Sequence, residues 1–271
     1  MINRRFKANR PKIVGDTNIK PYLRVISDII KESDIVLEVL DARMPELSRN
    51  SEIESLVKSS GKKLILILNK SDLVSEKDLR KNYQNLIKEN PTFVISSKDK
   101  MGTKRLREYI FMQAKNNGNE KFRIGILGYP NTGKSSVINS LTLRKKAKVT
   151  SKAGTTHGQQ WANFTDKISI IDSPGIIPLN ENDETRLALI ASKNVEKIKN
   201  PELVAHTIIN LFSDKTNIEK LYEIKINSDD PQEIIEQVGN KKRYIKKHGE
   251  VEIIRASSQI IRDWQSGKLR L

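Results

Sequence analysis

Hydrophobic residues along this chain gather in short runs that are separated by stretches with helical spacing. Residues 35–40 and 64–68 are almost entirely Ile, Leu and Val, and only Glu38 interrupts the first run. Continuous apolar runs of this length are typical of strands that are covered on both faces, as in a parallel sheet. Shorter runs predict three more strands, at 92–95, 123–128 and 168–171.

Between these runs, apolar residues recur every three or four positions, which predicts helices. The predicted helices cover about 21–33, 51–59, 75–89, 103–115 and 136–141. Pro21 suits the first turn of a helix, and Ser75 followed by Asp78 resembles a capping box. Strands that alternate with helices predict an α/β fold with a parallel sheet and a ligand site at the carboxyl edge of that sheet.

The last third of the chain shows helical spacing alone. Predicted helices lie at about 201–211, 217–221, 231–238 and 253–264, which indicates a small, mainly helical domain. The expected organisation is therefore a basic arm at 1–20, an α/β domain at 21–186 and a C-terminal helical domain at 187–271, which could bind RNA.

The distribution of charge indicates a possible binding partner. The 271 residues include 49 Lys and Arg against 33 Asp and Glu, a net charge of +16, and the cations cluster at 1–20, 141–152 and 241–247. Such clusters are typical of proteins that bind a polyanion such as RNA, although a chain rich in lysine can also use them simply to solvate its surface.

The sequence contains no cysteine, which excludes disulfides and thiolate zinc sites and fits a reducing cytoplasm. The basic N-terminus leads into no apolar run long enough for a signal peptide or a membrane helix. We therefore expect a soluble, cytoplasmic protein with no membrane partner, and a monomer is favoured.

Residues 128–135 read G-x-x-x-x-G-K-S between a predicted strand and a predicted helix. In this order the loop can turn its backbone N–H groups toward a polyphosphate, Lys134 adds a positive charge, and the Ser135 hydroxyl can ligate Mg²⁺. A glycine turn with a solvated lysine is the alternative. The candidate phosphate-binding residues are Asn131, Thr132, Gly133, Lys134, Ser135 and Ser136.

Asn69, Lys70 and Asp72 form the string N-K-x-D at the end of a buried strand. The carboxylate of Asp72 can accept hydrogen bonds from both the ring N–H and the exocyclic amino group of guanine, a donor pair that adenine lacks. Asn69 would brace neighbouring loops, and the stem of Lys70 would lie along the base. Ser96, Ser97 and Lys98 resemble an S-A-K element that contacts the base oxygen.

Residues 172–175 read D-x-P-G after the last predicted strand. Asp172 is expected to reach Mg²⁺ through water, and the N–H of Gly175 is expected to contact the terminal phosphate. Thr156, or else Thr155, would be a direct Mg²⁺ ligand. A simple turn is the alternative for this string when it is taken alone.

These motifs follow one another in an unusual order, because N-K-x-D and S-x-K precede the phosphate loop. With the string D-A-R-x-P at 41–45, the sequence resembles the YlqF/YawG family of circularly permuted GTPases over residues 21–185. The resemblance implies a three-layer P-loop NTPase fold, GTP hydrolysis with Mg²⁺, and binding to ribosomal RNA in assembly of the large ribosomal subunit. Small-subunit relatives typically carry a cysteine-based zinc domain, so that alternative fits less well.

The residue that orients the attacking water is not evident from the sequence. Ile176 occupies the position after D-x-P-G where many GTPases have glutamine. His157, next to Thr156, is a candidate for catalysis, and Asn131 resembles an asparagine that helps to hold K⁺ in related GTPases. We therefore expect slow intrinsic hydrolysis, stimulated by K⁺ and by ribosomal particles. The alternative is a nucleotide-gated RNA-binding scaffold with negligible hydrolysis.

Overall fold

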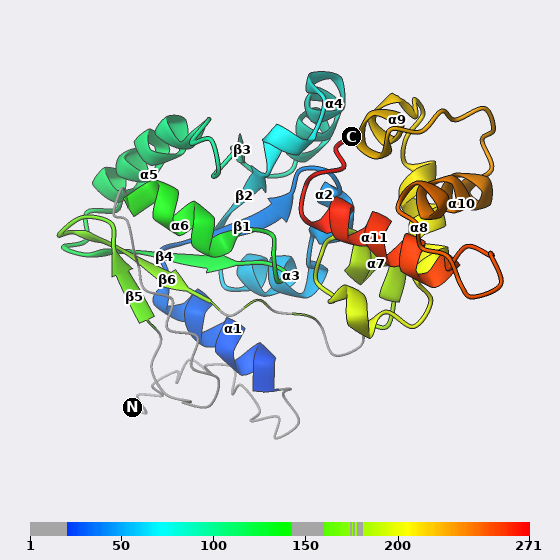
Figure 1. The fold of residues 1–271 in the computed structure, drawn as a ribbon. Coiled ribbons are helices and arrows are strands. Elements are labelled where there is room, and N and C mark those ends of the chain that lie inside the picture. The colour runs from blue at the N-terminus through cyan, green and yellow to red at the C-terminus, as the bar shows by residue number, and fades with distance from the viewer. Residues whose placement is uncertain (1–20, 143–159, 174, 176, 178–180) are drawn as a thin grey trace, which may run out of the picture.

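The computed structural model describes residues 21–142, 160–173, 175, 177 and 181–271, and it contains a six-stranded sheet (Figure 1). The strand order is β3-β2-β1-β4-β6-β5. The strands are β1 (Ile35–Asp41), β2 (Lys63–Asn69), β3 (Thr92–Val94), β4 (Phe122–Leu127), β5 (Gln160–Asn163) and β6 (Ile168–Asp172). The five strands predicted from the sequence are confirmed, with ends that differ by one or two residues.

The sheet is mixed, so the prediction of a wholly parallel sheet is wrong at one edge. Strand β5 pairs antiparallel with β6, and the other neighbouring pairs are parallel. Strand β5 was not predicted, because its four residues contain no continuous apolar run. An antiparallel strand at the edge of an otherwise parallel sheet is common in α/β folds.

Helices cover both faces of the sheet and make a three-layer fold (Figure 1). Helices α1 (Pro21–Glu32), α3 (Ser51–Ser59) and α4 (Glu76–Leu86) pack on one face. Helices α5 (Thr103–Asn117) and α6 (Lys134–Thr142) pack on the other. Each face has its own buried apolar cluster, as expected where the strands are apolar on both sides.

Local sequence explains where several helices begin. The hydroxyl of Ser75 accepts a hydrogen bond from the backbone N–H of Asp78 at 3.2 Å, which confirms the predicted cap of α4. Asn50 caps α3 in the same way. The short helix α2 (Pro45–Ser48) was not predicted, and it follows β1 directly.

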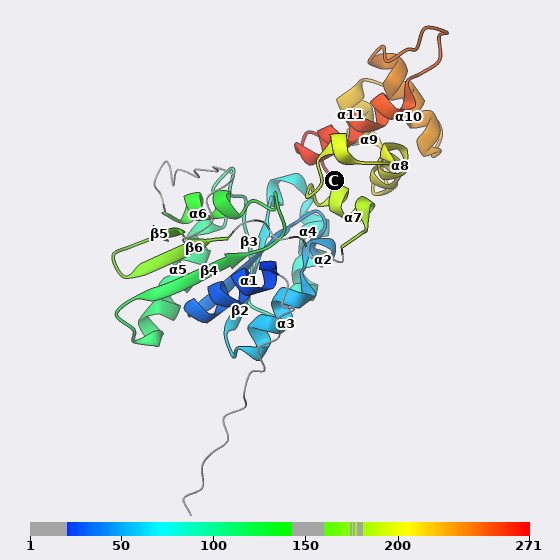
Figure 2. The ribbon, with the colours of Figure 1, turned by 90° about the horizontal axis from the view of Figure 1, so that it is seen from below.

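The C-terminal part contains α7 (Glu184–Leu189), α8 (Pro201–Asn210), α9 (Thr216–Tyr222), α10 (Pro231–Lys241) and α11 (Ile253–Gln265). These helices lie beyond one end of the sheet (Figure 2). Short 3₁₀ turns, η1 (Ser71–Leu73) and η2 (Val195–Lys197), complete the described elements. The four helices predicted in this region are confirmed as α8 to α11, whereas α7 was not predicted.

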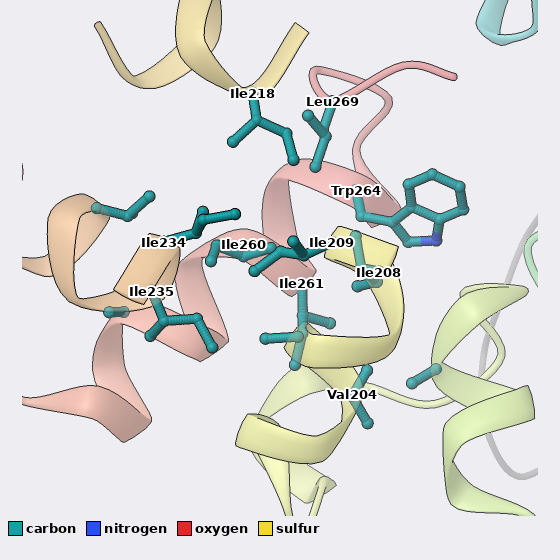
Figure 3. Packing of buried hydrophobic residues seen from close by; sticks show 14 of the residues in the cluster. Val204, Ile208, Ile209, Ile218, Ile234, Ile235, Ile260, Ile261, Trp264 and Leu269 are labelled. Carbon is teal, nitrogen blue, oxygen red and sulfur yellow. The ribbon is translucent and has the colours of Figure 1, made fainter. Parts of the chain in front are cut away.

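The C-terminal helices enclose a separate apolar core. Ile208 and Ile209 of α8 pack with Ile260 and Ile261 of α11, and Trp264 lies at the side of this group (Figure 3). All five side chains are at most 1 % exposed. Burial of a large apolar side chain contributes about 1.5 to 3 kcal/mol, so this core can hold the C-terminal helices together.

Strand order identifies where a ligand would bind. Strands β2 and β3 lie on the outer side of β1, and β6 and β5 lie on the outer side of β4. The direction in which strands are added to the sheet therefore reverses between the parallel neighbours β1 and β4. In open α/β sheets a ligand binds in the crevice at the carboxyl ends of such a strand pair.

Candidate guanine nucleotide site

The phosphate loop leaves β4 at Gly128 and enters α6 at Lys134. The amine of Lys134 is buried and donates hydrogen bonds to the carbonyl oxygens of Gly128 at 3.1 Å and Tyr129 at 2.8 Å. The Thr132 hydroxyl donates to the same Tyr129 oxygen at 3.0 Å. The lysine amine is therefore held at the loop itself, where it can exchange these carbonyls for phosphate oxygens.

The backbone of this loop has positive φ at three residues. The values are 139° at Gly128, 60° at Asn131 and 98° at Gly133. Left-handed residues set among ordinary ones turn successive N–H groups into a concavity that binds anions. The helix that follows adds the positive end of its dipole, so the loop has the backbone form that a polyphosphate requires.

Asn69 joins the phosphate loop to the base-recognition turn, which we define as Asn69–Leu73. Its side-chain nitrogen donates to the Thr132 carbonyl at 2.9 Å, and its side-chain oxygen accepts from the N–H of Ser97 at 3.1 Å. A Cβ at Gly133 would overlap the Asn69 amide, so only glycine allows this close approach. Three loops that are distant in sequence are thus fixed by one buried side chain.

The half-buried Asp72 lies within this turn and contacts the neighbouring loop. The hydroxyl of Ser96 lies 2.8 Å from Asp72 Oδ1 and 3.1 Å from Asp99 Oδ2. This contact orients the Asp72 carboxylate, while Lys98 is exposed at the rim. The residues Asn69, Lys70, Asp72, Ser96, Ser97 and Lys98 come together at the ends of β2 and β3.

Asp41 and Arg43 form a buried ion cluster with Lys70. The Asp41 carboxylate accepts from Arg43 Nε at 3.0 Å, from Arg43 Nη2 at 2.8 Å and from Lys70 Nζ at 2.8 Å. Burial by itself would raise the pKa of Asp41, but the two cations outweigh it and lower this pKa to about 2. Burial also lowers the pKa of Lys70, and Asp41 offsets part of that effect.

The D-x-P-G segment lies beside the phosphate loop. Backbone pairing sets Asp172 opposite Ile126 of β4, and the Ser173 hydroxyl donates to the Ile126 carbonyl at 2.5 Å. A Cβ at Gly175 would lie 2.6 Å from Cα of Pro130, so glycine is required for this contact. Thr155, Thr156, His157 and Ile176 lie outside the described residues.

Ser135 and Asp172 are the residue types that would hold Mg²⁺ at this edge of the sheet. Ser135 stands in the first turn of α6, and the backbone of Asp172 ends β6 at the same edge of the sheet. A hydroxyl and a carboxylate are the hard oxygen ligands that Mg²⁺ prefers, with water and phosphate oxygens completing its shell. Among the described residues, no group of three or more His, Asp or Glu is placed to hold a metal ion.

The C-terminal region contacts the phosphate loop directly. The side-chain nitrogen of Asn131 donates to the Ala191 carbonyl at 2.7 Å, and the Ser192 hydroxyl donates to the Pro130 carbonyl at 3.0 Å. Tyr129 packs in a small apolar cluster with Leu187, Ile190 and Ile177. These contacts could not be predicted from the sequence, because their acceptors are backbone carbonyls, which every residue has.

A lysine-bearing phosphate loop, an N-K-x-D turn and a D-x-P-G segment thus follow β4, β2 and β6 at the same edge of the sheet. This fold and this set of loops define a P-loop GTPase domain whose motifs are circularly permuted. A family model described as RsgA GTPase matches residues 24–181, and a second, described as 50S ribosome-binding GTPase, matches residues 123–245. The chain belongs to the RsgA GTPase family and is a circularly permuted GTPase of the YlqF type.

Individual relatives agree with this assignment. The chain is 40 % identical over 251 residues to an uncharacterized GTP-binding protein of Methanocaldococcus jannaschii, covering 92 % of this chain and 66 % of that protein. It is 36 % identical to nucleolar GTP-binding protein 2 of Pneumocystis carinii, covering 89 % of this chain and 51 % of that protein. The chain thus spans half to two thirds of the length of these relatives.

A solved structure supports the fold as well. GNP-bound YlqF from T. maritima aligns with a TM-score of 0.63 and 26 % identity, covering 93 % of this chain and 96 % of that one. The expected family and fold class are therefore confirmed. No helix among the described residues combines the length and apolar character needed to cross a membrane.

Proposed function

We propose that this chain binds GTP and hydrolyses it to GDP and phosphate as a switch in ribosome assembly. The observation that carries the proposal is the bridge made by Asn69, which holds the base-recognition turn and the phosphate loop in one site. Asp72 would accept from the guanine donors, and Lys134 would bind the outer phosphates. GTP-binding relatives and the matched GTPase families support this assignment.

Hydrolysis would transfer the terminal phosphoryl group to water. The water oxygen bonds to the terminal phosphorus, and the bond from that phosphorus to the bridging oxygen breaks, leaving GDP. Ser135 and Asp172, with Thr156, would hold Mg²⁺, which neutralises phosphate charge when bound. The N–H of Gly175 would contact the terminal phosphate, since Gly175 lies against Pro130 of the phosphate loop.

Potassium is the second ion in this proposal. The Asn131 side-chain nitrogen donates to the Ala191 carbonyl, an arrangement that turns its side-chain oxygen away from that carbonyl. This oxygen would hold K⁺, whose charge stabilises the transition state in place of an arginine finger. His157 would be the nearest candidate to orient water.

The proposed partner is the ribosome, specifically the large subunit and its RNA. One family model that matches the chain is described as 50S ribosome-binding GTPase. The turn after α10 also favours RNA: Lys242, Arg243, Lys246 and Lys247 are exposed, and Ile245 pairs with Val251 to form a short hairpin. Exposed cations on a projecting hairpin can approach phosphates with little loss of solvation. We propose that the protein acts in the cytoplasm as a monomer.

A scaffold that binds nucleotide but hydrolyses almost none is the second candidate. Ile177 packs beside Tyr129 in an apolar cluster, and an isoleucine side chain cannot orient water. In that case GTP would control only the shape of an RNA-binding protein. A small-subunit assembly GTPase is the third candidate, and its difference from the first lies in which ribosomal particle stimulates turnover.

One experiment separates these candidates. GTP hydrolysis is measured in KCl for the protein alone, with purified large subunits and with purified small subunits, and Lys134→Ala provides the blank. Our proposal predicts slow turnover alone and strong stimulation by large subunits only. Tight GTP binding without turnover under any condition would favour the scaffold, and stimulation by small subunits alone would assign the protein to the small subunit. Equal turnover in matched NaCl and KCl would remove K⁺ from the proposal.

A further inference from the structure

The end of α11 lies against the base-recognition turn, although the two are almost 200 residues apart in sequence. Arg43, which binds Asp41, also donates from Nη1 to the Trp264 carbonyl at 2.5 Å. Its guanidinium carbon lies 4.3 Å from the centre of the Trp264 ring. Both side chains are buried, so Arg43 connects α11 to Asp41 and, through that carboxylate, to Lys70.

A second contact reaches the same turn from the residues that follow α11. The N–H of Leu271 donates to the Leu73 carbonyl at 3.2 Å. Gly267 has a φ of 75°, which favours glycine, and a Cβ there would lie 3.0 Å from the end of the Leu73 side chain, so the two segments pack closely. Leu73 directly follows Asp72, so α11 reaches the Lys70 side of the turn through Arg43 and Asp41, and the residues after α11 contact its Leu73 side.

Trp264 also supports the segment that touches the phosphate loop. Its indole N–H donates to the Leu189 carbonyl at 2.8 Å. Gln265 donates from its side chain to the carbonyls of Ala188 and Lys193, both at 3.0 Å. Residues 188–193 include Ala191 and Ser192, which contact the phosphate loop. The end of α11 therefore supports the segment that contacts this loop.

We propose that Arg43, the end of α11 and the residues that follow it, 264–271 in all, form a positioning element for the guanine base. This inference rests on the proposed function, because it assumes that the site binds a guanine nucleotide. The element holds Lys70 and Asp72 in the geometry that the base requires. By linkage, occupancy of the base site changes the stability of α11 by the same coupling free energy that α11 contributes to base binding.

This coupling between the base site and α11 is distinct from the coupling that the D-x-P-G segment would provide between the terminal phosphate and the C-terminal region. That segment responds to the terminal phosphate, whereas Arg43 and Leu271 act on the turn that binds the base, which GDP and GTP share. The C-terminal domain would therefore distinguish an occupied site from an empty one, in addition to GTP from GDP. Nucleotide loss itself would be transmitted to the helical domain.

Base selectivity tests this proposal. Affinities for GDP and for inosine diphosphate, which lacks the exocyclic amino group, are compared in the wild type, in Arg43→Gln and in Arg255→Gln. Arg255 is an exposed arginine of α11 that stacks on Tyr244, so it is a matched control. A positioning role predicts that Arg43→Gln weakens GDP about tenfold and inosine diphosphate clearly less, within the usual range of coupling between sites.

Equal losses for both nucleotides, or no loss, would overturn the proposal. Failure of the wild type to bind either nucleotide would overturn the proposed function instead. If Arg43→Gln does not fold, the emission of Trp264 decides the matter in a Trp161→Phe background, since the sequence has only these two tryptophans. A change in emission on saturation with GDP supports the positioning element, and unchanged emission contradicts it.

Discussion

The side-chain nitrogen of Asn69 lies 2.9 Å from the carbonyl oxygen of Thr132. This hydrogen bond joins the turn that would recognise the base to the loop that would bind the phosphates. Both atoms are buried, and the other end of the Asn69 amide accepts from Ser97. The two halves of the nucleotide site are thus fixed relative to each other by a single side chain.

Replacing Asn69 with alanine should weaken GDP binding by about tenfold to a hundredfold. The variant leaves the Thr132 carbonyl and the Ser97 N–H without their partner, and each buried group left unsatisfied costs about 1 to 3 kcal/mol. Binding of a fluorescent GDP analogue measures the effect. Asn139→Ala, at an exposed position of α6, is the control and should bind as the wild type does. Equal affinity in both variants would contradict the bridging role of Asn69.

Glu38 should make the protein less stable as the pH rises. This carboxyl lies fully buried in the middle of β1, and burial, with the nearby charge of Glu54, raises its pKa to about 8. The unfolded chain releases this proton near the ordinary value of 4.5, whereas the folded protein keeps it until about pH 8. The free energy of unfolding should therefore fall between these two values.

The variant Glu38→Gln tests this dependence, because glutamine is neutral and nearly isosteric. Urea unfolding at pH 5, 7 and 9 should give a smaller loss of stability with pH than in the wild type, by about 2 to 4 kcal/mol over the range. Glu120→Gln, at an exposed position, should keep the wild-type slope. If both variants have the wild-type slope, Glu38 is not the group that titrates.

Trp264→Phe should destabilise the C-terminal helices by about 2 kcal/mol, because it removes volume from a full core and leaves the Leu189 carbonyl without its donor. The lost hydrogen bond is the 2.8 Å contact from the indole N–H. Urea unfolding followed by far-ultraviolet circular dichroism measures the change. Tyr244→Phe removes only a long, 3.4 Å contact to Gln259 and should change stability far less. Similar losses in the two variants would contradict this view of Trp264.

The hairpin after α10 should contribute to RNA binding through its charge. Changing Lys246 and Lys247 together to glutamate should weaken binding to ribosomal RNA. It should also reduce the dependence of the affinity on salt, because a protein that contacts fewer phosphates releases fewer counterions when it binds. The double variant Lys77→Glu with Lys81→Glu changes the net charge equally on exposed positions of α4. A filter-binding titration at several salt concentrations would show the difference. If both double variants weaken RNA binding equally, the effect comes from the net charge of the protein and not from contacts of the hairpin with RNA.

Much of the site could be predicted because its chemistry belongs to side chains in short strings. The spacing of Gly128, Gly133 and Lys134, and the carboxylate of Asp72 after a buried strand, each indicate a function without any structure. The apolar runs likewise identified the strands of the sheet, because strands buried on both faces leave a continuous signal.

Other features left no such signal. In the sequence, the string from Asp41 to Pro45 indicates only a family resemblance. The contact of Arg43 with Trp264, 221 residues away, is visible only in the structure. Long-range contacts of this kind depend on packing, and the contact from Asn131 to Ala191 ends on a backbone carbonyl that any residue has. Strand β5 was not predicted because its sequence, Q-W-A-N, has polar residues at both ends and contains no continuous apolar run.

Recognition of guanine by Asp72 is the central feature of the proposed site, and the base selectivity of Asp72→Asn tests it. Asparagine places a donor where the carboxylate has an acceptor, so the variant should lose most of its affinity for GDP and gain affinity for xanthosine diphosphate, whose ring carries an oxygen in place of the amino group. We predict that the order of the two affinities reverses between wild type and variant. An Asp72→Asn variant that binds GDP as tightly as the wild type would contradict the account.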